Sequence, residues 1–457
     1  MTAAQAVTSR ADDEKLGGGA MDGKVQVRAG RAAWWMLAVL WMLYCLSFVH
    51  KYTIAMLVEP MKLELGFTDF QMSIILGPAF SICYALATVP FGWAADRLPN
   101  MRRTLAAGGS MICSAATIAM GLAHTFGTMV GARIALGTSE AAVSPTAYSL
   151  IGDLFPRARL MTATSIFQTA IKVGQATAFA LTGVLLATLP TVSFGGFDFS
   201  PWRSIMIMFS LPGLVLGLLL YTCRTPQRVH PSAADGPART LGSFIVEHRK
   251  ILARFAIGFL LADLCSAALI SWTPTYVSRH FGLSPAYYGP IIGSLSIASA
   301  AVLVMNGLIV DRLYARGMKD ANLRFYSWML AVSLPFGFSI YFVTSPSIFL
   351  VMFAFLQMVM ISFASFATAG LSSLAPPHLR GRLIAIFLLM INIVGGGLGP
   401  LIIGALTDFV FHDKMKIGMS LAVLLSIAMP GAFIALRSCL PGWRRAIERS
   451  DALAAAS

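Results

Sequence analysis

Long apolar runs alternate with short polar turns along almost the whole chain, from about residue 33 to residue 440. Each run is long enough for an α-helix to cross the hydrocarbon core of a membrane, which takes about 20 residues. A polar stretch at 224–250 that contains three prolines divides the runs into two sets of six. The pattern predicts an all-α membrane protein of twelve transmembrane helices in two pseudo-symmetric six-helix bundles. The predicted spans are residues 33–58, 70–95, 104–123, 128–151, 162–189 and 203–223, then 252–278, 287–310, 325–343, 347–374, 383–407 and 417–437.

The same alternation of apolar runs and polar stretches predicts the domain organisation. Residues 1–32 mix charges of both signs around a glycine-rich patch and contain no apolar core, so we expect a disordered tail. Residues 33–223 form the first predicted bundle and residues 251–440 the second. Residues 224–250 are the predicted linker between them, and residues 441–457 form a second tail.

Composition agrees with a membrane protein, since 57% of the residues are hydrophobic, 12% are charged and the mean hydropathy is +0.74. The net charge of +14 raises the possibility of nucleic-acid binding. The lysines and arginines instead gather in the loops on one side of the predicted spans, which excludes a nucleic-acid partner. By the positive-inside rule both termini are cytoplasmic, in the cell (inner) membrane. Membrane lipids and a small-molecule or lipid-like substrate are the expected partners of a monomer.

A short motif occurs twice, half a chain apart. The second span ends in GWAADRL at 92–98, and the eighth ends in GLIVDRL at 307–313. Glycine and aspartate four residues apart share one helix face, so a neighbouring helix can approach the glycine while its N-terminus donates to the aspartate. The repetition predicts a duplicated unit with a gate on the cytoplasmic side. The gating candidates are Gly92, Asp96, Arg97, Arg102, Gly307, Asp311 and Arg312.

Ionisable residues inside the predicted spans are costly, so each predicts a functional role. Arg133 and Glu140 lie two turns apart on one helix face, about 10 Å from each other, so each needs a partner on another helix. His50 and Lys51 in the first span are the candidates for that partnership. Lys172 either enters the same cavity or snorkels toward the membrane surface. The candidates for substrate binding or proton coupling are His50, Lys51, Arg133, Glu140, Lys172 and Asp263.

The repeated GxxxDR motif within twelve spans resembles the major facilitator superfamily over residues 33–440. Four segments are similar to the spinster-like branch of that family, namely YTIAMLVEP at 52–60, RIALGTSEAAVSP at 133–145, IGDLFPR at 151–157 and SIF at 165–167. The resemblance implies the major facilitator fold, spans 1 and 4 against a central cavity, and two bundles that rock about a central site. It implies a secondary transporter, and some members of the branch move lysolipids or sphingosine-type amphiphiles.

One residue departs from the spinster-like pattern, which implies an acid at position 50, where this chain has histidine. A histidine also titrates near neutral pH, so we expect a proton switch that involves Glu140 and His50; a static buried network is the alternative. Lys51, Arg133 and Lys172 outnumber the acids around the expected cavity, which favours an anionic or amphipathic substrate.

Other classes of function fit the sequence less well. It contains no nucleophile motif, no phosphate-binding glycine loop and no metal-like spacing of histidine or cysteine, so we expect no enzyme activity, catalytic residue, metal or cofactor. A receptor or scaffold on the same fold is one alternative, although it would not need ionisable groups in spans 1 and 4. A multidrug-type efflux carrier is the other.

Overall fold

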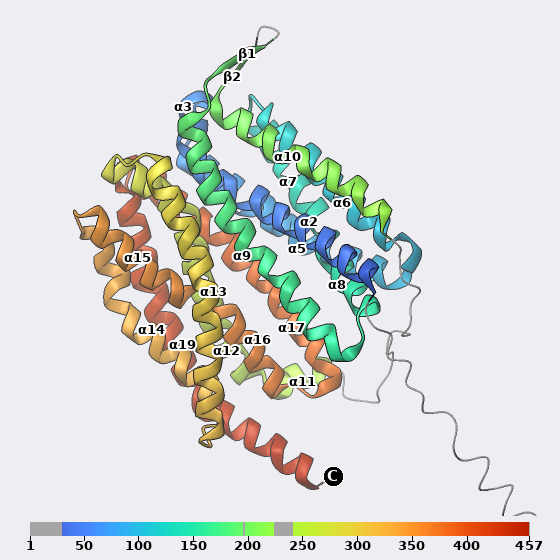
Figure 1. Cartoon of the computed structure of the whole chain (residues 1–457). Helices are drawn as coiled ribbons and strands as arrows, with labels where there is room; N and C mark the ends of the chain where they lie inside the picture. The colour runs from blue at the N-terminus through green and yellow to red at the C-terminus, as the bar shows by residue number, and fades with distance from the viewer. Residues whose placement is uncertain (1–29, 195–196, 224–240, 457) are drawn as a thin grey trace, which may run out of the picture.

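The computed structural model describes residues 30–194, 197–223 and 241–456, and these residues are almost entirely helical (Figure 1). The predicted tail at 1–32 lies outside the described residues up to residue 29. The predicted linker lies outside them from 224 to 240.

The first half contains helices joined by short connections and one small antiparallel hairpin. Pro78, Pro201 and the Thr68–Gln71 and Thr125–Thr128 capping boxes begin four of these helices, as their backbone chemistry favours. The elements are α2 (Arg31–Met56), α3 (Val58–Leu65), α4 (Asp69–Leu76), α5 (Pro78–Arg97), η1 (Pro99–Met101), α6 (Arg102–Gly121), α7 (Phe126–Glu140), α8 (Val143–Leu154), α9 (Arg157–Thr188), β1 (Val192–Phe194), β2 (Phe197–Phe199), α10 (Pro201–Leu219) and η2 (Leu220–Thr222).

The second half repeats this organisation, and its eleventh predicted span includes two π-helical segments, η4 and η5. Several glycines lie in η4, where neighbouring helices approach closely. The elements are α11 (Leu241–Glu247), α12 (Arg249–Phe281), α13 (Pro285–Ala315), α14 (Ala321–Ser339), η3 (Ile340–Phe342), α15 (Pro346–Met360), α16 (Phe363–Leu374), α17 (Pro377–Ile391), η4 (Asn392–Leu398), α18 (Gly399–Ala405), η5 (Leu406–Val410), η6 (Lys414–Lys416) and α19 (Ile417–Ala456).

Eleven helices within the described residues are long and apolar enough to cross a membrane, which confirms the predicted fold class. The fourth predicted span, 128–151, is the exception, because Arg133 and Glu140 lower its hydropathy; it is also divided into α7 and α8 by a turn at Ala141 and Ala142. Its counterpart in the second half is divided in the same way, into α15 and α16 around Ile361 and Ser362. The paired helices have equal lengths, 15 and 12 residues in each half, which supports the duplication inferred from the sequence.

The helices form two bundles, α2–α10 and α12–α19, that meet along α9 and α13, α4 and α18, α5 and η4, and α2 and α12. We call the end with the β1–β2 hairpin the hairpin end, and the opposite end, where α10 ends and α12 begins, the linker end. Glycines bring the backbones together toward the hairpin end. A Cβ atom on Gly183 of α9 would collide with the carbonyl oxygen of Pro285 and lie 3.2 Å from the Cα of Gly289 on α13.

Ion pairs join the two bundles at the hairpin end. The guanidinium of Arg279, at the end of α12, donates two hydrogen bonds of 2.8 and 2.7 Å to the carboxylate of Asp69, at the start of α4. It also donates to Glu59 on α3, and Lys62 forms a second ion pair with Asp69. The side chain of Asp69 is completely buried. We call these four residues the Asp69–Arg279 network.

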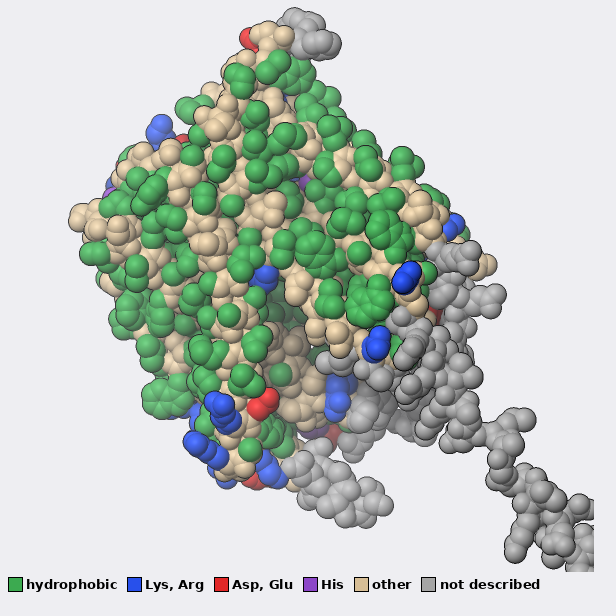
Figure 2. All heavy atoms as spheres, in the orientation of Figure 1, with side chains coloured by type: hydrophobic (Ala, Val, Ile, Leu, Met, Phe, Trp, Pro, Cys, Tyr) green, Lys and Arg blue, Asp and Glu red, His purple; other side chains and the backbone are tan. Residues whose placement is uncertain are grey.

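The linker ends of the bundles are less tightly joined. Helices α8, α16 and α17 pack mainly within their own bundles, and the surface is hollowed near this end of the face shown in Figure 2. Lysine and arginine side chains gather toward the linker end of the same face, whereas its middle is largely hydrophobic. The space between the bundles is therefore closed at the hairpin end and open toward the linker end.

Candidate functional site

Arg133 lies at the centre of the first bundle and is 1% exposed. It donates hydrogen bonds to three backbone carbonyls, those of Ile75 (3.0 Å), Lys51 (3.2 Å) and His50 (3.5 Å). Its guanidinium also lies 4.9 Å from the ring centre of Phe80. Arg133 thus ties α7 to α2 and α4, and its described hydrogen bonds go to the backbone and not to Glu140.

Lys51 lies beside three aromatic rings, with its Nζ 5.0 Å from the ring centre of Phe80, 5.7 Å from Phe48 and 5.8 Å from Tyr52. Cation–π attraction holds an ammonium group in such a position. Glu140 and Asp263 attract its charge, and Arg133 repels it. Lys51 is thus attracted by an acid of each bundle, and no described ion pair joins it to either of them.

Those two acids are buried with unused hydrogen-bonding capacity. Glu140 is 4% exposed and Asp263 is 6% exposed, and one carboxylate oxygen of each has no hydrogen-bond partner in the described part of the chain. Asp263 packs so closely against η4 that a Cβ atom on Gly395 would collide with its carboxylate. Unpaired buried carboxylate oxygens are costly, so both groups are suited to accept a proton or to bind a donor.

No described hydrogen bond or ion pair joins His50 to Glu140, and the side-chain contacts of His50 lie on α6 and α10. Its Nε2 atom lies 2.9 Å from the carbonyl oxygen of Phe209 on α10, and its Nδ1 atom lies 3.4 Å from the sulfur of Cys113 on α6. Adjacent residues on a helix project about 100° apart, so His50 and Lys51 of α2 face different neighbours. The His50 side chain joins α2 to α6 and α10 within the first bundle. We call Lys51, Arg133, Glu140 and Asp263 the charge cluster.

Lys172 is half-buried on α9, and no described acid forms an ion pair with it. One turn further along lies Gln175, which is 1% exposed and whose amide nitrogen has no hydrogen-bond partner in the described part of the chain. On α9, Lys172 and Gln175 lie on the face between the side that packs against α2 and the side that packs against α13. A cation and a free amide donor are suited to an anionic group.

The predicted gating residues are not joined in this conformation. Arg97 and the pair Asp311 and Arg312 are exposed, and the side chain of Asp96 lies outside the described residues. The close packing predicted at Gly307 is absent, since a Cβ atom there would meet nothing within 4 Å, and one on Gly92 would make an ordinary 4.0 Å contact with Pro145. The physical reason is that the bundles are parted at the linker end.

Arg102 is the buried member of that group and holds two helices of its own bundle together. It is 1% exposed and donates hydrogen bonds of 2.6 Å to Asp153 and 3.0 Å to the hydroxyl of Ser149, both on α8. Its contacts stabilise the linker-end part of the first bundle.

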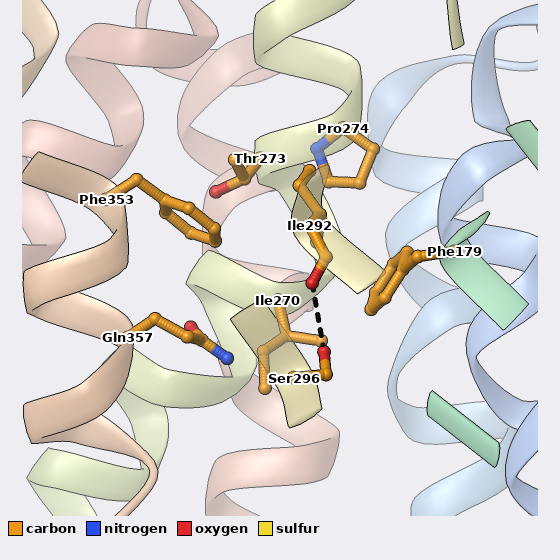
Figure 3. A pocket seen from close by; sticks show the side chains of 8 residues that line it. All are labelled: Phe179, Ile270, Thr273, Pro274, Ile292, Ser296, Phe353 and Gln357. Atoms are coloured by element: carbon orange, nitrogen blue, oxygen red, sulfur yellow. Dashed lines mark hydrogen bonds between the residues drawn. The ribbon is translucent and has the colours of Figure 1, made fainter. Parts of the chain in front are cut away.

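A small pocket lies between α9, α12, α13 and α15 (Figure 3). Thr273 of α12 and Gln357 of α15 present polar atoms to it. The hydroxyl of Thr273 and the side-chain carbonyl of Gln357 have no hydrogen-bond partners among the described residues. The lining residues are Phe179, Ile270, Thr273, Pro274, Ile292, Ser296, Phe353 and Gln357.

The sequence interpretation did not single out Gln175, Gln357, Asp69 or Arg279. A signal existed for the two glutamines, because Gln357 is the only amide side chain in the predicted span 347–374 and Gln175 lies one turn from Lys172 within a span. Asp69 and Arg279 lie at span ends, where charged residues are ordinary, so only their meeting in three dimensions marks them. The described residues contain no cluster of histidine, cysteine, aspartate or glutamate suited to a metal ion.

Comparisons with known proteins agree with this architecture. A model of the Major Facilitator Superfamily matches residues 40–400. An MFS-type efflux pump of Mycolicibacterium smegmatis is 25% identical over 403 residues, which cover 87% of this chain and 90% of that protein. A D-galactonate transporter of Escherichia coli is 23% identical over 412 residues, covering 83% and 90%. Protein spinster of Drosophila melanogaster is 22% identical over 284 residues, covering 61% of this chain and 45% of that protein.

Among solved structures, a bacterial homolog of the human lysosomal transporter spinster, in an inward-facing and unoccupied conformation, superposes with a TM-score of 0.74. It is 18% identical and covers 92% of this chain and 97% of its own. The resemblance to spinster-like proteins that the sequence predicted is thus confirmed in both sequence and fold. The protein is a multi-pass membrane transporter and not an enzyme, and the chain belongs to the Major Facilitator Superfamily.

Proposed function

We propose that this transporter moves a small organic anion by proton-coupled alternating access. The observation that carries the proposal is the burial of two carboxylates, Glu140 and Asp263, one in each bundle, each with an oxygen that has no hydrogen-bond partner among the described residues. Lys51 is the buried cation whose charge both of them attract. When one of the two acids takes up a proton, it no longer attracts Lys51 as strongly, and Lys51 can then bind an anionic substrate.

The coupling follows from charge balance around Lys51. While Glu140 is ionised it attracts the Lys51 ammonium and competes with an anionic substrate for it. When Glu140 takes up a proton, that competition ends, and substrate binding to Lys51 becomes more favourable. Linkage is reciprocal, so a bound anion also favours the protonated form of Glu140. Proton and anion therefore move in the same direction.

The proposed substrate class has two sources of support. Lys51, Arg133 and Lys172 place positive charge beside the central space, whereas Glu140 and Asp263 are the facing acids. Several relatives carry names that specify organic acids, such as the D-galactonate transporter and a probable sulfoacetate transporter of Cupriavidus necator. An organic acid or a lysolipid-like amphiphile fits this charge pattern.

Replacing Glu140 with Gln tests the coupling. We expect the variant to bind substrate and to exchange it down a gradient, but to lose the acceleration that an imposed pH gradient gives the wild type, because Gln takes up no proton. The measurement is flux of radiolabelled organic anions into proteoliposomes at zero and inward proton gradients. Glu448→Gln is the matched control, because Glu448 is an exposed carboxylate on α19. If Glu140→Gln retains the full pH response, Glu140 is not the proton site, and Asp263→Asn becomes the variant to compare.

The repeated motif at the linker end supports a gate in the opposite conformation. Closing the linker end would bring Gly92 and Asp96 of one bundle, and Gly307 and Asp311 of the other, against their neighbours. We propose that this end is cytoplasmic and that the protein resides in the inner membrane, because basic side chains gather there. We expect Asp96→Asn to keep the linker end open, by roughly 1–3 kcal/mol. Thiol labelling of a cysteine at exposed Met101 would measure this, and an unchanged labelling rate would contradict it.

Efflux is the second candidate function, because the relative from Mycolicibacterium smegmatis is named an efflux pump. The rings of Phe48, Tyr52 and Phe80 around Lys51 suit a partly apolar solute. Flux measured from both sides of oriented proteoliposomes separates uptake from efflux.

A further inference from the structure

The inner face of α9 changes steadily from exposed to buried as it runs from the linker end toward the hairpin end. Gln168 is exposed, Lys172 is half-buried, and Gln175 and Phe179 are each 1% exposed. These four residues share one helix face at spacings of three and four. They form a wall whose burial increases toward the hairpin end.

The packing of α9 shows that this face is directed between the bundles. On one side, Gly174 lies against Cys45 and Phe48 of α2. On the other side, Gly183 lies against Pro285 of α13. The four residues named above lie on the face between these two contacts, whereas Val184 is exposed on the opposite surface.

The small pocket continues this wall, since Phe179 belongs to both (Figure 3). Phe179 contributes its ring from the first bundle, and Thr273 and Gln357 face it from the second. Thr273 is 0% exposed and Gln357 is 4% exposed. In a helix a threonine hydroxyl commonly bonds to the carbonyl one turn earlier, as Thr407 does here, but the Thr273 hydroxyl does not.

Buried polar atoms without partners are rare in folded proteins and call for an explanation. Two such atoms in one pocket, beside the rings of Phe179 and Phe353, are suited to a neutral group that both donates and accepts hydrogen bonds. A hydroxyl group on a carbon chain meets this requirement. A hydrocarbon tail does not, because it would leave both polar atoms buried and unpaired, which is unfavourable.

We propose that this pocket is a substrate subsite that binds a hydroxylated end, while Lys172 and Gln175 bind the anionic end. Seven residues separate Lys172 from Phe179, which places the two subsites about 10 Å apart along α9. The substrate is therefore a compact hydroxylated organic anion and not a single-chain lipid, whose tail would need an apolar path beyond the pocket. The Asp69–Arg279 network and the contact of Gly183 with Pro285 close that direction. This inference rests on the proposed transport of an organic anion and specifies its substrate class.

The proposal predicts a preference among three probes. Gluconate has a carboxylate and hydroxyl groups on a six-carbon chain, hexanoate has the same length without hydroxyl groups, and oleoyl lysophosphatidate has a phosphate on a long apolar chain. Hexanoate cannot make the two hydrogen bonds offered by Thr273 and Gln357, and each such bond is expected to change affinity about tenfold. We expect gluconate to bind at least about 100-fold more tightly than hexanoate, and lysophosphatidate not to compete.

Two substitutions locate the preference in the pocket. Thr273→Val and Gln357→Leu remove the unpaired polar atoms with little change in volume. Each is expected to weaken gluconate binding about tenfold, which is the effect of losing one hydrogen bond. Hexanoate binding should stay unchanged or become tighter. Thr275→Val is the matched control, because Thr275 is also buried with an unpartnered hydroxyl on α12 but does not line the pocket.

Binding is measured by thermal stabilisation of the purified full chain, and flux by counterflow in proteoliposomes. The proposal is overturned if gluconate fails to bind, if hexanoate or lysophosphatidate binds equally well, or if Thr275→Val reproduces the loss seen with the two pocket variants. These outcomes are distinct from failure of the proposed coupling, which the pH response of Glu140→Gln reports separately.

Discussion

Replacing Asp69 with Asn is expected to open the hairpin end and close the linker end. Asp69 is completely buried between Arg279 and Lys62, so the neutral side chain leaves two cations without their partner. Removing one member of a buried ion pair costs about 3–5 kcal/mol. Arg279 belongs to the other bundle, so this cost falls on the conformation in which the bundles meet at the hairpin end. About 5.5 kcal/mol is enough to convert a 99:1 ratio of two states into 1:99, so the population should come close to inversion.

Distances between spin labels measure this shift. Labels at exposed Leu63 and Met415 report on the hairpin end, and labels at exposed Met101 and Arg316 report on the linker end. In the variant the first distance should lengthen while the second shortens. Arg324→Gln is the matched control, because the Asp320–Arg324 pair lies within one helix of one bundle. Unchanged distances in Asp69→Asn would show that the network does not hold the bundles together.

Replacing Arg133 with Lys is expected to destabilise the whole first bundle by several kcal/mol. The guanidinium spans three backbone carbonyls from two other helices, and an ammonium group lacks the planar fork that reaches all of them. Each carbonyl left without a donor costs about 1–3 kcal/mol. The positive charge is retained, so a loss of stability reports the lost geometry and not the lost charge.

The measurement is the denaturant dependence of unfolding in detergent or bicelles. Arg445→Lys is the matched control, since Arg445 donates to one carbonyl, that of Pro441, from an exposed position. Equal stability of Arg133→Lys and the control would contradict a structural role for the three hydrogen bonds and would leave Arg133 free to act on the substrate.

The repeated glycine–aspartate motif and the apolar runs predicted the fold class, because a membrane-spanning helix can be recognised from the composition of about 20 consecutive residues. The break after Glu140 was not predictable, since Ala141 and Ala142 favour helix and the turn depends on packing between helices. The partner of Lys51 was predicted only in part. The family resemblance implied that spans 1 and 4 line one cavity, which placed Glu140 near Lys51. Asp263 comes from the other half of the chain, and its position depends on the contact with Gly395.

His50 shows a second limit of sequence interpretation. Its position beside Lys51 suggested a shared role, although adjacent helical residues face different neighbours. Whether position 50 faced the cavity or the bundle interior depended on the placement of Cys113 and Phe209, which are distant in the sequence. Which of these side chains meet in the charge cluster therefore depends on tertiary packing, and a local sequence pattern does not predict it.

The closed hairpin end also determines where the membrane voltage acts. Water and ions that enter from the linker end extend that side's electrical potential into the space between the bundles, so the voltage falls mainly across the thin closed layer around Asp69 and Gly183. Moving one elementary charge through that layer changes its energy by about 2.3 kcal/mol per 100 mV. A proton bound near Glu140 crosses most of this field when access passes from one end to the other, without moving far within the protein. The protonation state of Glu140 and its neighbours when the closed end switches therefore determines the net charge moved in each cycle. That net charge determines how strongly transport responds to voltage.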